Sequence, residues 1–422
     1  MPEQIKIAHI DAAAAVYAVN ATLRRIDERL VDHGERVAFI ACELCEAGKL
    51  PLDMKTLFLL CAFHDIGAYK TDEIDRMLEF ETNDVWNHSV YGYLFMKYMT
   101  PLRESAEAVL YHHTPWEDLL QADTAQKDYA SLLHIADRID IALTYGRDAS
   151  GLERLAACSG VLFRSDYAEI AERCFYERQM AKRLSDGSYL QKNRERLHEF
   201  FPIADETMEY LKMIVYAIDF RSEHTVTHTI NTVSLAVNIA RHFGFQGEEL
   251  EKIYLGALLH DVGKIAIPVS ILEYPGRLSE EEMKVMRTHV KETEYLIRGI
   301  VSEEVCRIAV RHHEKLDGSG YPYGLTADEL TLPERIVAVA DIVSALSSRR
   351  SYKEPFPREK TLMILEQMSE SQLDPSVCAY VSEHYDNIMN ATEPDRIRII
   401  EKYQSIMAEY ENVAVRMEAM GK

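Results

Sequence analysis

Long apolar runs, glycine and proline are all scarce in this chain of 422 residues. No stretch of 18 apolar residues occurs, so the sequence predicts no membrane-spanning helix and no insertion into a membrane. The 18 glycines and 13 prolines are fewer than an average chain of this length carries, which favours long helices over turns. The apolar fraction of 47% is ordinary for a globular protein and excludes a largely disordered chain.

Positive charge is also in short supply. The chain has 47 Lys and Arg residues against 69 Asp and Glu residues, which gives a formal net charge of −22. This balance disfavours binding to DNA, to an RNA polymer or to an anionic membrane surface. A small anionic substrate remains compatible, because a bound metal ion can invert the local electric field.

Cysteines are few and unevenly spaced. The seven cysteines are an odd number and lie mostly inside helical patterns, which indicates reduced thiols and a cytoplasmic location. The beginning of the chain contains Asp11 and no basic leader, so we expect no signal peptide. Cys42 and Cys45 have the spacing of half a zinc site, but no second pair follows, and we interpret them as residues of a helix face.

Helical periodicity continues through almost the whole chain without convincing two-residue alternation. One long irregular stretch, residues 316–333, is rich in Gly, Pro and Asp, and a loop of that length in a compact domain is more often functional than idle. We therefore expect an all-α protein of three parts: a helical domain with a helical connector over residues 1–200, a second helical domain over 201–385, and a helical tail over 386–422.

An ordered set of seven polar residues occurs twice. The first set is His33, His64, Asp65, His88, His112, His113 and Asp137, and the second is His228, His260, Asp261, His289, His312, His313 and Asp341. Each histidine by itself could simply be hydrogen-bonded inside a helical core. Two copies in the same order instead indicate a duplicated domain.

Each set would bring five imidazoles and two carboxylates into the interior of one helical bundle. That is too many ligands for a single tetrahedral zinc ion, but it suits two six-coordinate ions that share a carboxylate. Mixed nitrogen and oxygen donors favour iron or manganese. Two ions held close together can activate a water molecule and clamp a phosphoryl group, so the pattern predicts hydrolysis of a phosphate ester.

Two longer motifs in the second half carry a family resemblance. Residues 260–264 read His-Asp-Val-Gly-Lys and match an HD-x-G-K element, and residues 312–322 match the signature HHE-x-x-DG-x-GYP almost in full. Residues 339–353 match the segment with the last metal ligand. Over residues 205–385 the chain therefore resembles an HD-GYP domain, the bacterial branch of the HD phosphohydrolases that hydrolyses cyclic dinucleotides in signal transduction.

The resemblance implies a role for each matched residue. The second set of seven residues would bind two divalent transition-metal ions, with Asp261 bridging them. Lys264 would hold a phosphate oxygen as a point cation. Tyr321 would lie beside a base, and Arg350 and Lys353 would meet phosphate.

The sequence departs from the family pattern at two positions. Ser344 stands where the family commonly has a second Asp, three residues after the last metal ligand, so a supporting acidic contact is lost. His224 lies one helical turn before His228, where members with a third ion have Glu. We hypothesise a weak third-ion role for His224, against the simpler interpretation of a histidine near a helix start.

The first half resembles a divergent HD domain. It keeps all seven ligand positions, but Ala68 replaces the lysine, and Thr-Pro-Trp-Glu-Asp follows His113 in place of the Gly-Tyr-Pro loop. Three interpretations remain open: a regulatory or sensory metal module, which we favour, a second phosphohydrolase of different specificity, and a structural dimerisation unit. A second copy of the chain is accordingly a candidate partner.

The predicted function is a metal-dependent phosphodiesterase. Cyclic di-GMP is the first candidate substrate, with the linear dinucleotide as product and the mononucleotide if both bonds are cut. Two alternatives remain: cyclic GMP-AMP as the substrate, or a receptor that binds a cyclic dinucleotide without hydrolysis and signals to a partner.

Overall fold

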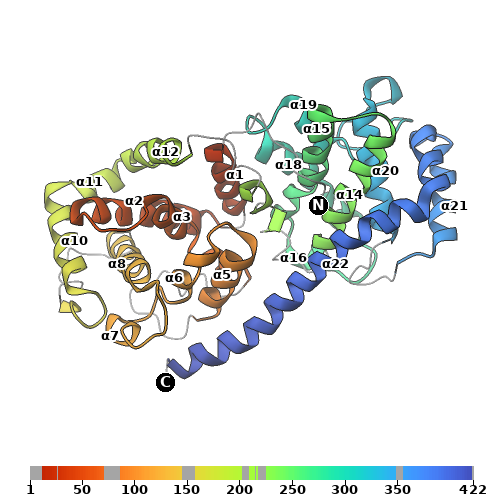
Figure 1. The fold of residues 1–422 in the computed structure, drawn as a ribbon. Helices are drawn as coiled ribbons and strands as arrows, with labels where there is room; N and C mark the ends of the chain where they lie inside the picture. Colours follow the sequence, from red (N-terminus) through yellow and green to blue (C-terminus); the bar gives the residue numbers. More distant parts are fainter. Residues whose placement is uncertain are drawn as a thin grey trace. The chain divides into compact units, whose positions relative to one another are not determined.

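The structure is a computed structural model that describes residues 12–25, 27–70, 86–144, 157–201, 209–213, 215–216, 225–347 and 355–420. Within these ranges the chain is helical and forms no β-strand, which confirms the predicted all-α fold (Figure 1). No helix in the described part is long and apolar enough to cross a membrane. The chain divides into two compact units, which we call the N-terminal unit (Asp27–Pro202 with Ser405–Lys422) and the C-terminal unit (Met1–Ile26 with Ile203–Gln404).

The N-terminal unit is built around one long helix, α2, which packs against α3, α8, α10 and α12. Asp27 begins α2 by accepting a hydrogen bond from the backbone N–H of Arg29, and Lys49 ends it in a left-handed conformation with φ of 50°. The elements of this unit are α2 (Glu28–Gly48), α3 (Met54–Phe63), η1 (Ile66–Lys70), α5 (Trp86–Met99), η2 (Arg103–Ser105), α6 (Glu107–Leu110), α7 (Trp116–Leu119), α8 (Lys127–Thr144), α10 (Ser165–Glu177), α11 (Met180–Ser185) and α12 (Ser188–Phe200).

The C-terminal unit repeats this arrangement around α14, which packs against α15 and α20. Ser279 and Glu282 form a capping box at the start of α17, with reciprocal side-chain and backbone hydrogen bonds. The elements are α1 (Ala12–Arg24), α14 (Thr225–His242), α15 (Gly247–Leu259), η4 (Val262–Ala266), α16 (Val269–Leu272), α17 (Glu280–Arg287), α18 (His289–Ile297), α19 (Glu303–Val310), η5 (Ala327–Glu329), α20 (Leu332–Ser347), α21 (Arg358–Ser369) and the part of α22 (Pro375–Met420) up to residue 404.

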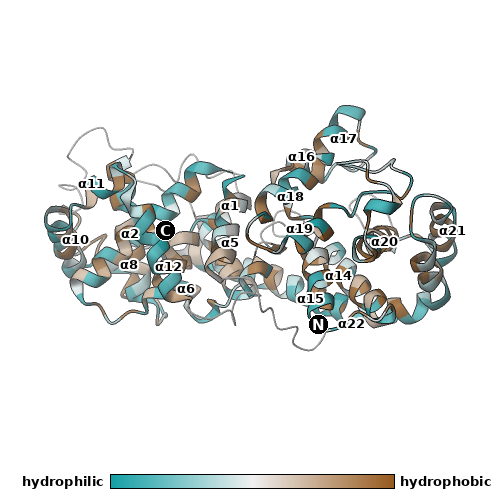
Figure 2. Ribbon diagram, turned by 90° about the horizontal axis from the view of Figure 1, so that it is seen from above, coloured by the Kyte–Doolittle hydropathy of each residue, from teal (hydrophilic) through white to brown (hydrophobic). Residues whose placement is uncertain are grey.

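The two units have matching helix contacts, as a duplication predicts. In the N-terminal unit α2 contacts α3 and α8, and α5 contacts η1. In the C-terminal unit α14 contacts α15 and α20, and α18 contacts η4. Both cores are mostly apolar, with buried polar residues among them, and the surface helices alternate between polar and apolar residues, as α22 does in Figure 2.

The compact units differ from the expected segments at both ends of the chain. Helix α1 contacts η4 and α18 of the C-terminal unit, with Val16 and Val19 fully buried. The last part of α22 belongs to the N-terminal unit, where Glu409 accepts hydrogen bonds from Tyr93 and Lys97 of α5. Each bundle is therefore completed by a helix from the opposite end of the sequence.

Candidate metal centre

The seven predicted residues of the C-terminal unit come together from five parts of the bundle. His228 lies on α14, His260 and Asp261 directly follow α15, His289 begins α18, the pair at 312 and 313 follows α19, and Asp341 lies on α20. Every one of them is buried except His313, whose side chain is 27% exposed. Helix ends and helix faces converge here because the bundle core brings α14, α15, α19 and α20 into contact.

Backbone carbonyls fix the orientation of three of the rings. The Nδ1 atoms of His260, His289 and His312 lie 2.7, 2.7 and 2.6 Å from the carbonyl oxygen of the residue three positions earlier. If Nδ1 carries the proton and donates it to the carbonyl, the Nε2 lone pair of each ring faces the centre of the cluster. Metal-ligating histidines are commonly held in this way.

Asp261 lies between two groups of histidines. Its Oδ2 atom is 3.1 Å from His260 Nε2 and 3.6 Å from His228 Nε2. Its Oδ1 atom is 3.4 Å from His289 Nε2 and 3.9 Å from His312 Nε2. The two oxygens of one carboxylate thus face two separate ligand groups, which is the arrangement of a carboxylate that bridges two ions.

Asp341 closes the cluster on the other side. Its Oδ1 atom is 3.0 Å from His228 Nε2, and its Oδ2 atom is 3.6 Å from His313 Nδ1. Burial would raise the pKa of both buried carboxyl groups. Neighbouring histidines, together with Lys264 at Asp261, nevertheless hold the pKa values of Asp261 and Asp341 well below the usual range, so both are anionic.

The donor set fits a pair of metal ions. The Nε2 atoms of His260, His289 and His312 and Oδ1 of Asp261 are buried, and none has a hydrogen-bond partner among the residues that the structure describes. Burial lowers the pKa of His289 to about 4 and that of His313 to about 3, so these imidazoles are neutral and can donate a lone pair. Buried polar atoms without partners are rare, and a pair of cations would satisfy all four of them.

Lys264 and the loop after His313 border this cluster. Lys264 Nζ lies 2.5 Å from Asp261 Oδ2, and its side chain is 17% exposed. The Tyr321 ring lies 4.7 Å from the His313 ring, centroid to centroid. Glu314, only 2% exposed, holds the loop by accepting hydrogen bonds from the backbone N–H of Tyr323 at 2.7 Å and of Leu325 at 2.9 Å.

Ser344, which stands where the family commonly has a second Asp, contacts the first histidine of the cluster. Its hydroxyl lies 3.0 Å from Nδ1 of His228 and donates to the carbonyl oxygen of the same residue at 3.0 Å. A neutral hydroxyl, rather than a carboxylate, therefore supports this ring.

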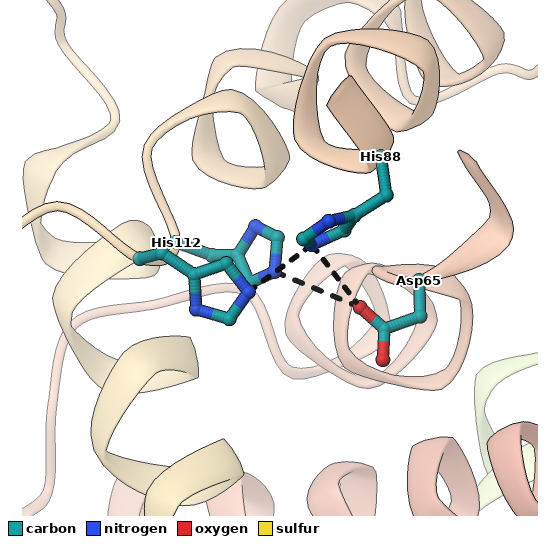
Figure 3. Close-up of side chains that lie close together, drawn as sticks. Asp65, His88 and His112 are labelled. Carbon is teal, nitrogen blue, oxygen red and sulfur yellow. Dashed lines mark hydrogen bonds and ion pairs between the residues drawn. The ribbon is translucent and has the colours of Figure 1, made fainter. Parts of the chain in front are cut away.

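The N-terminal unit brings its own seven residues together in the same geometry. Asp65 Oδ2 is 3.2 Å from His64 Nε2, and Asp65 Oδ1 is 3.7 Å from Nε2 of both His88 and His112. Figure 3 shows His88 and His112 directed at Asp65 from different parts of the chain. His33 Nε2 lies 3.1 Å from Asp137 Oδ1, and His113 Nδ1 lies 3.7 Å from Asp137 Oδ2.

Three sequence-predicted residues, His224, Arg350 and Lys353, lie outside the described residues. Sequence reasoning gave no role to four other residues: Arg138 and Asp140, which contact the N-terminal cluster, and Glu314 and Arg287, which contact the loop that borders the C-terminal one. Asp140 had a signal: it follows Asp137 by three positions, the same spacing as Ser344 after Asp341. Arg287 had none, because its place depends on the fold of the loop that holds Tyr321.

Comparisons with known proteins agree with this geometry. Family models described as HD domain match residues 30–142 and 212–377. The 3'3'-cGAMP-specific phosphodiesterase 1 of Vibrio cholerae is 28% identical over 416 residues, covering 92% of this chain and 95% of that protein. The cyclic di-GMP phosphodiesterase response regulator RpfG of Xanthomonas campestris is 40% identical over 166 residues, covering 39% of this chain and 44% of that protein.

Among solved structures, a cyclic GMP-AMP specific phosphodiesterase of V. cholerae matches with a TM-score of 0.54 and 19% identity, covering 90% of this chain and 98% of that chain. At this identity the match shows the shared fold. The two matched segments each contain one full set of the His and Asp residues that form the clusters described above. The chain therefore belongs to the HD-domain family and carries two HD domains in tandem.

Proposed function

We propose that the C-terminal unit is a metal-dependent phosphodiesterase that hydrolyses a cyclic dinucleotide. The observation that carries this proposal is Asp261, whose two carboxylate oxygens face two separate groups of buried histidines. This arrangement supports a binuclear centre formed by His228, His260, Asp261, His289, His312, His313 and Asp341. The mixed imidazole and carboxylate donors favour iron or manganese.

Bound metal ions would activate a water molecule and offset charge on the phosphoryl oxygens. The protein side chains then have three tasks. Lys264, next to Asp261, binds a phosphoryl oxygen and stabilises the charge that develops on it. Tyr321, beside the ligand His313, offers an aromatic face to a base, while Arg350 and Lys353 bind phosphate. Burial of the cluster excludes bulk water and strengthens each of these electrostatic contacts.

Two substrates are candidates. Cyclic di-GMP is supported by the match to RpfG, which has the higher identity but covers only 39% of this chain. Cyclic GMP-AMP is supported by the match over 92% of this chain to the V. cholerae enzyme. The metal and phosphate contacts are common to both substrates, so base contacts must decide between them.

Product analysis by chromatography tests the proposal. Purified protein loaded with iron or manganese is offered cyclic di-GMP and cyclic GMP-AMP side by side, with Asp261→Ala as the control. Linear product from the wild-type protein and none from the control is the expected result, and the preferred substrate identifies the base preference. Binding of either nucleotide without turnover, at full metal loading, would instead favour the receptor.

A further inference from the structure

We propose that the N-terminal unit holds a second binuclear metal centre and retains its metal more firmly than the C-terminal unit does. The Nε2 atoms of His64 and His112 and Oδ1 of Asp65 are buried without a hydrogen-bond partner in the described part of the chain. They correspond to three of the four unpartnered atoms of the other cluster. Buried polar atoms without partners are rare, so the N-terminal cluster, like the C-terminal one, is expected to bind cations.

The ring orientations repeat as well. Nδ1 of His64 lies 2.8 Å from the carbonyl oxygen of Cys61, and Nδ1 of His112 lies 2.5 Å from that of Val109. With Nδ1 held by a backbone carbonyl, the second nitrogen of each ring faces the cluster. Asp65 again presents one oxygen to each of two histidine groups.

The two clusters differ in the side chain that contacts Nδ1 of the first histidine, His33 or His228. His33 Nδ1 lies 2.7 Å from the buried carboxylate of Asp140, which Arg36 also holds through contacts of 2.6 and 2.9 Å. The corresponding support in the C-terminal unit is the neutral hydroxyl of Ser344. A carboxylate behind a ligating histidine fixes the ring and raises its basicity, and losing such a partner typically weakens metal binding 10- to 100-fold.

The positively charged side chain beside the cluster also differs in position between the two units. Ala68 is fully buried at the position of Lys264, so Asp65 has no lysine beside it there. Arg138 instead contacts Asp137 Oδ2 at 2.7 Å, where the C-terminal unit has Ile342. In the described part of the chain the cation beside the cluster thus contacts Asp137 rather than the bridging carboxylate of Asp65.

Metal counting on the full chain tests this inference independently of catalysis. We expect about four ions per chain in the wild-type protein and about two in each of Asp65→Ala and Asp261→Ala. During dialysis against a chelator, Asp261→Ala should release its remaining metal at least tenfold more slowly than Asp65→Ala. Two ions in the wild-type protein and none in Asp261→Ala would overturn the second centre.

A reciprocal exchange tests the reason for the stronger retention. Asp140→Ser should speed metal release from the N-terminal centre, and Ser344→Asp should slow release from the C-terminal centre. Circular dichroism confirms folding, and His112→Gln replaces Asp65→Ala if the latter does not fold. Equal release rates from the two centres in all variants would refute the role of Asp140.

A separate observation concerns Arg287, which we infer to be a substrate contact of the C-terminal unit; this rests on the proposed function. Its guanidinium lies 4.9 Å from the centroid of the Tyr321 ring, and that ring lies 4.7 Å from the ring of His313. Arg287 is exposed and forms no ion pair or hydrogen bond with any residue that the structure describes. In a chain of net charge −22, an arginine that stacks on Tyr321 and has no acidic partner in the described part of the chain is well suited to a phosphate.

The aromatic contact gives Arg287 a defined position. Stacking on a ring leaves the N–H groups at the edge of the guanidinium free, so they can bind a phosphate by two parallel hydrogen bonds. A cyclic dinucleotide has two phosphates, and only one is attacked at a time. We assign Arg287 to the phosphate that is not being cleaved.

The test compares Arg287→Ala and Arg287→Lys with Lys284→Ala, a control on the same helix whose lysine pairs with Glu281. KM for the cyclic dinucleotide should rise about tenfold or more in Arg287→Ala, and partly recover in Arg287→Lys. The loss of kcat/KM should be much smaller for bis(p-nitrophenyl) phosphate, which has one phosphate. Equal losses for both substrates, or none, would overturn the assignment.

Failure of the proposed function gives a different result. A wild-type protein that binds the nucleotide without hydrolysis refutes the enzyme, but Arg287→Ala must still raise the dissociation constant about tenfold. A wild-type protein that cleaves bis(p-nitrophenyl) phosphate but binds neither cyclic dinucleotide overturns both proposals.

Discussion

One methyl group added at Gly263 should move α18, and with it His289, away from Asp261 in the C-terminal cluster. A Cβ atom at this position would lie 1.9 Å from the carbonyl oxygen of His289 and 2.4 Å from the backbone nitrogen of Thr293. Both contacts are to the backbone of α18, so no side-chain rotation can relieve them. The Thr293 hydroxyl also accepts a hydrogen bond from the Gly263 N–H at 2.9 Å, which holds η4 and α18 together.

The size of the effect follows from these distances. Carbon and carbonyl oxygen normally stay about 3.3 Å apart, so Gly263→Ala must move α18 by roughly 1.4 Å. His289 begins α18 and now lies 3.4 Å from Asp261 Oδ1. We expect a loss of stability of about 1–3 kcal/mol from overpacking. Because a displacement of about 1 Å can lower a rate about 100-fold, we expect a loss of kcat of about that size.

The assay combines steady-state kinetics with metal counting. Gly276→Ala is the matched control, because a Cβ there would meet only the exposed side chain of Tyr274, at 3.0 Å. Gly67→Ala is the counterpart in the N-terminal unit, where the Cβ would lie 2.0 Å from the carbonyl oxygen of His88. Gly263→Ala should lose metal from the C-terminal unit, and Gly67→Ala should lose metal from the N-terminal unit. Wild-type metal content and kcat in Gly263→Ala would refute the claim that this close contact sets the ligand geometry.

Three further predictions concern single side chains. Lys264→Ala should lower kcat about 100- to 1,000-fold in steady-state assays while the metal content stays at the wild-type level, and lost metal would contradict a phosphate-binding role. Glu314→Ala should free the loop at Tyr323, raise KM and speed limited proteolysis there, whereas unchanged proteolysis would contradict the anchoring role. Burial lowers the pKa of Lys402 to about 8, below its unfolded value of about 10.4, so its charged form destabilises the fold at neutral pH. Lys402→Met should therefore raise the melting temperature at pH 7, and less so as the pH rises through 8 toward 10; an equal gain at all pH values would refute this reasoning.

The sequence by itself determined the fold class and the composition of both clusters. Helical periodicity and the scarcity of glycine and proline predicted the all-α fold, and two ordered sets of His and Asp residues predicted the duplication. The fold class and the duplication could be predicted because helix formation depends on local periodicity, and because a repeated order of residues is visible in the sequence itself. The prediction that both halves are HD domains is confirmed by the family matches.

Only the tertiary structure showed with which unit each end of the chain packs. It alone also showed which residues support the two clusters. Helix α1 packs with the C-terminal unit and the end of α22 with the N-terminal unit, because burial of an apolar helix face depends on which partner surface lies nearby, not on distance along the chain. The contact of Arg287 with Tyr321 likewise required the folded loop. Asp140 and Ser344 occupy the same sequence position in their units, yet only the folded structure showed that both lie behind the first histidine of a cluster.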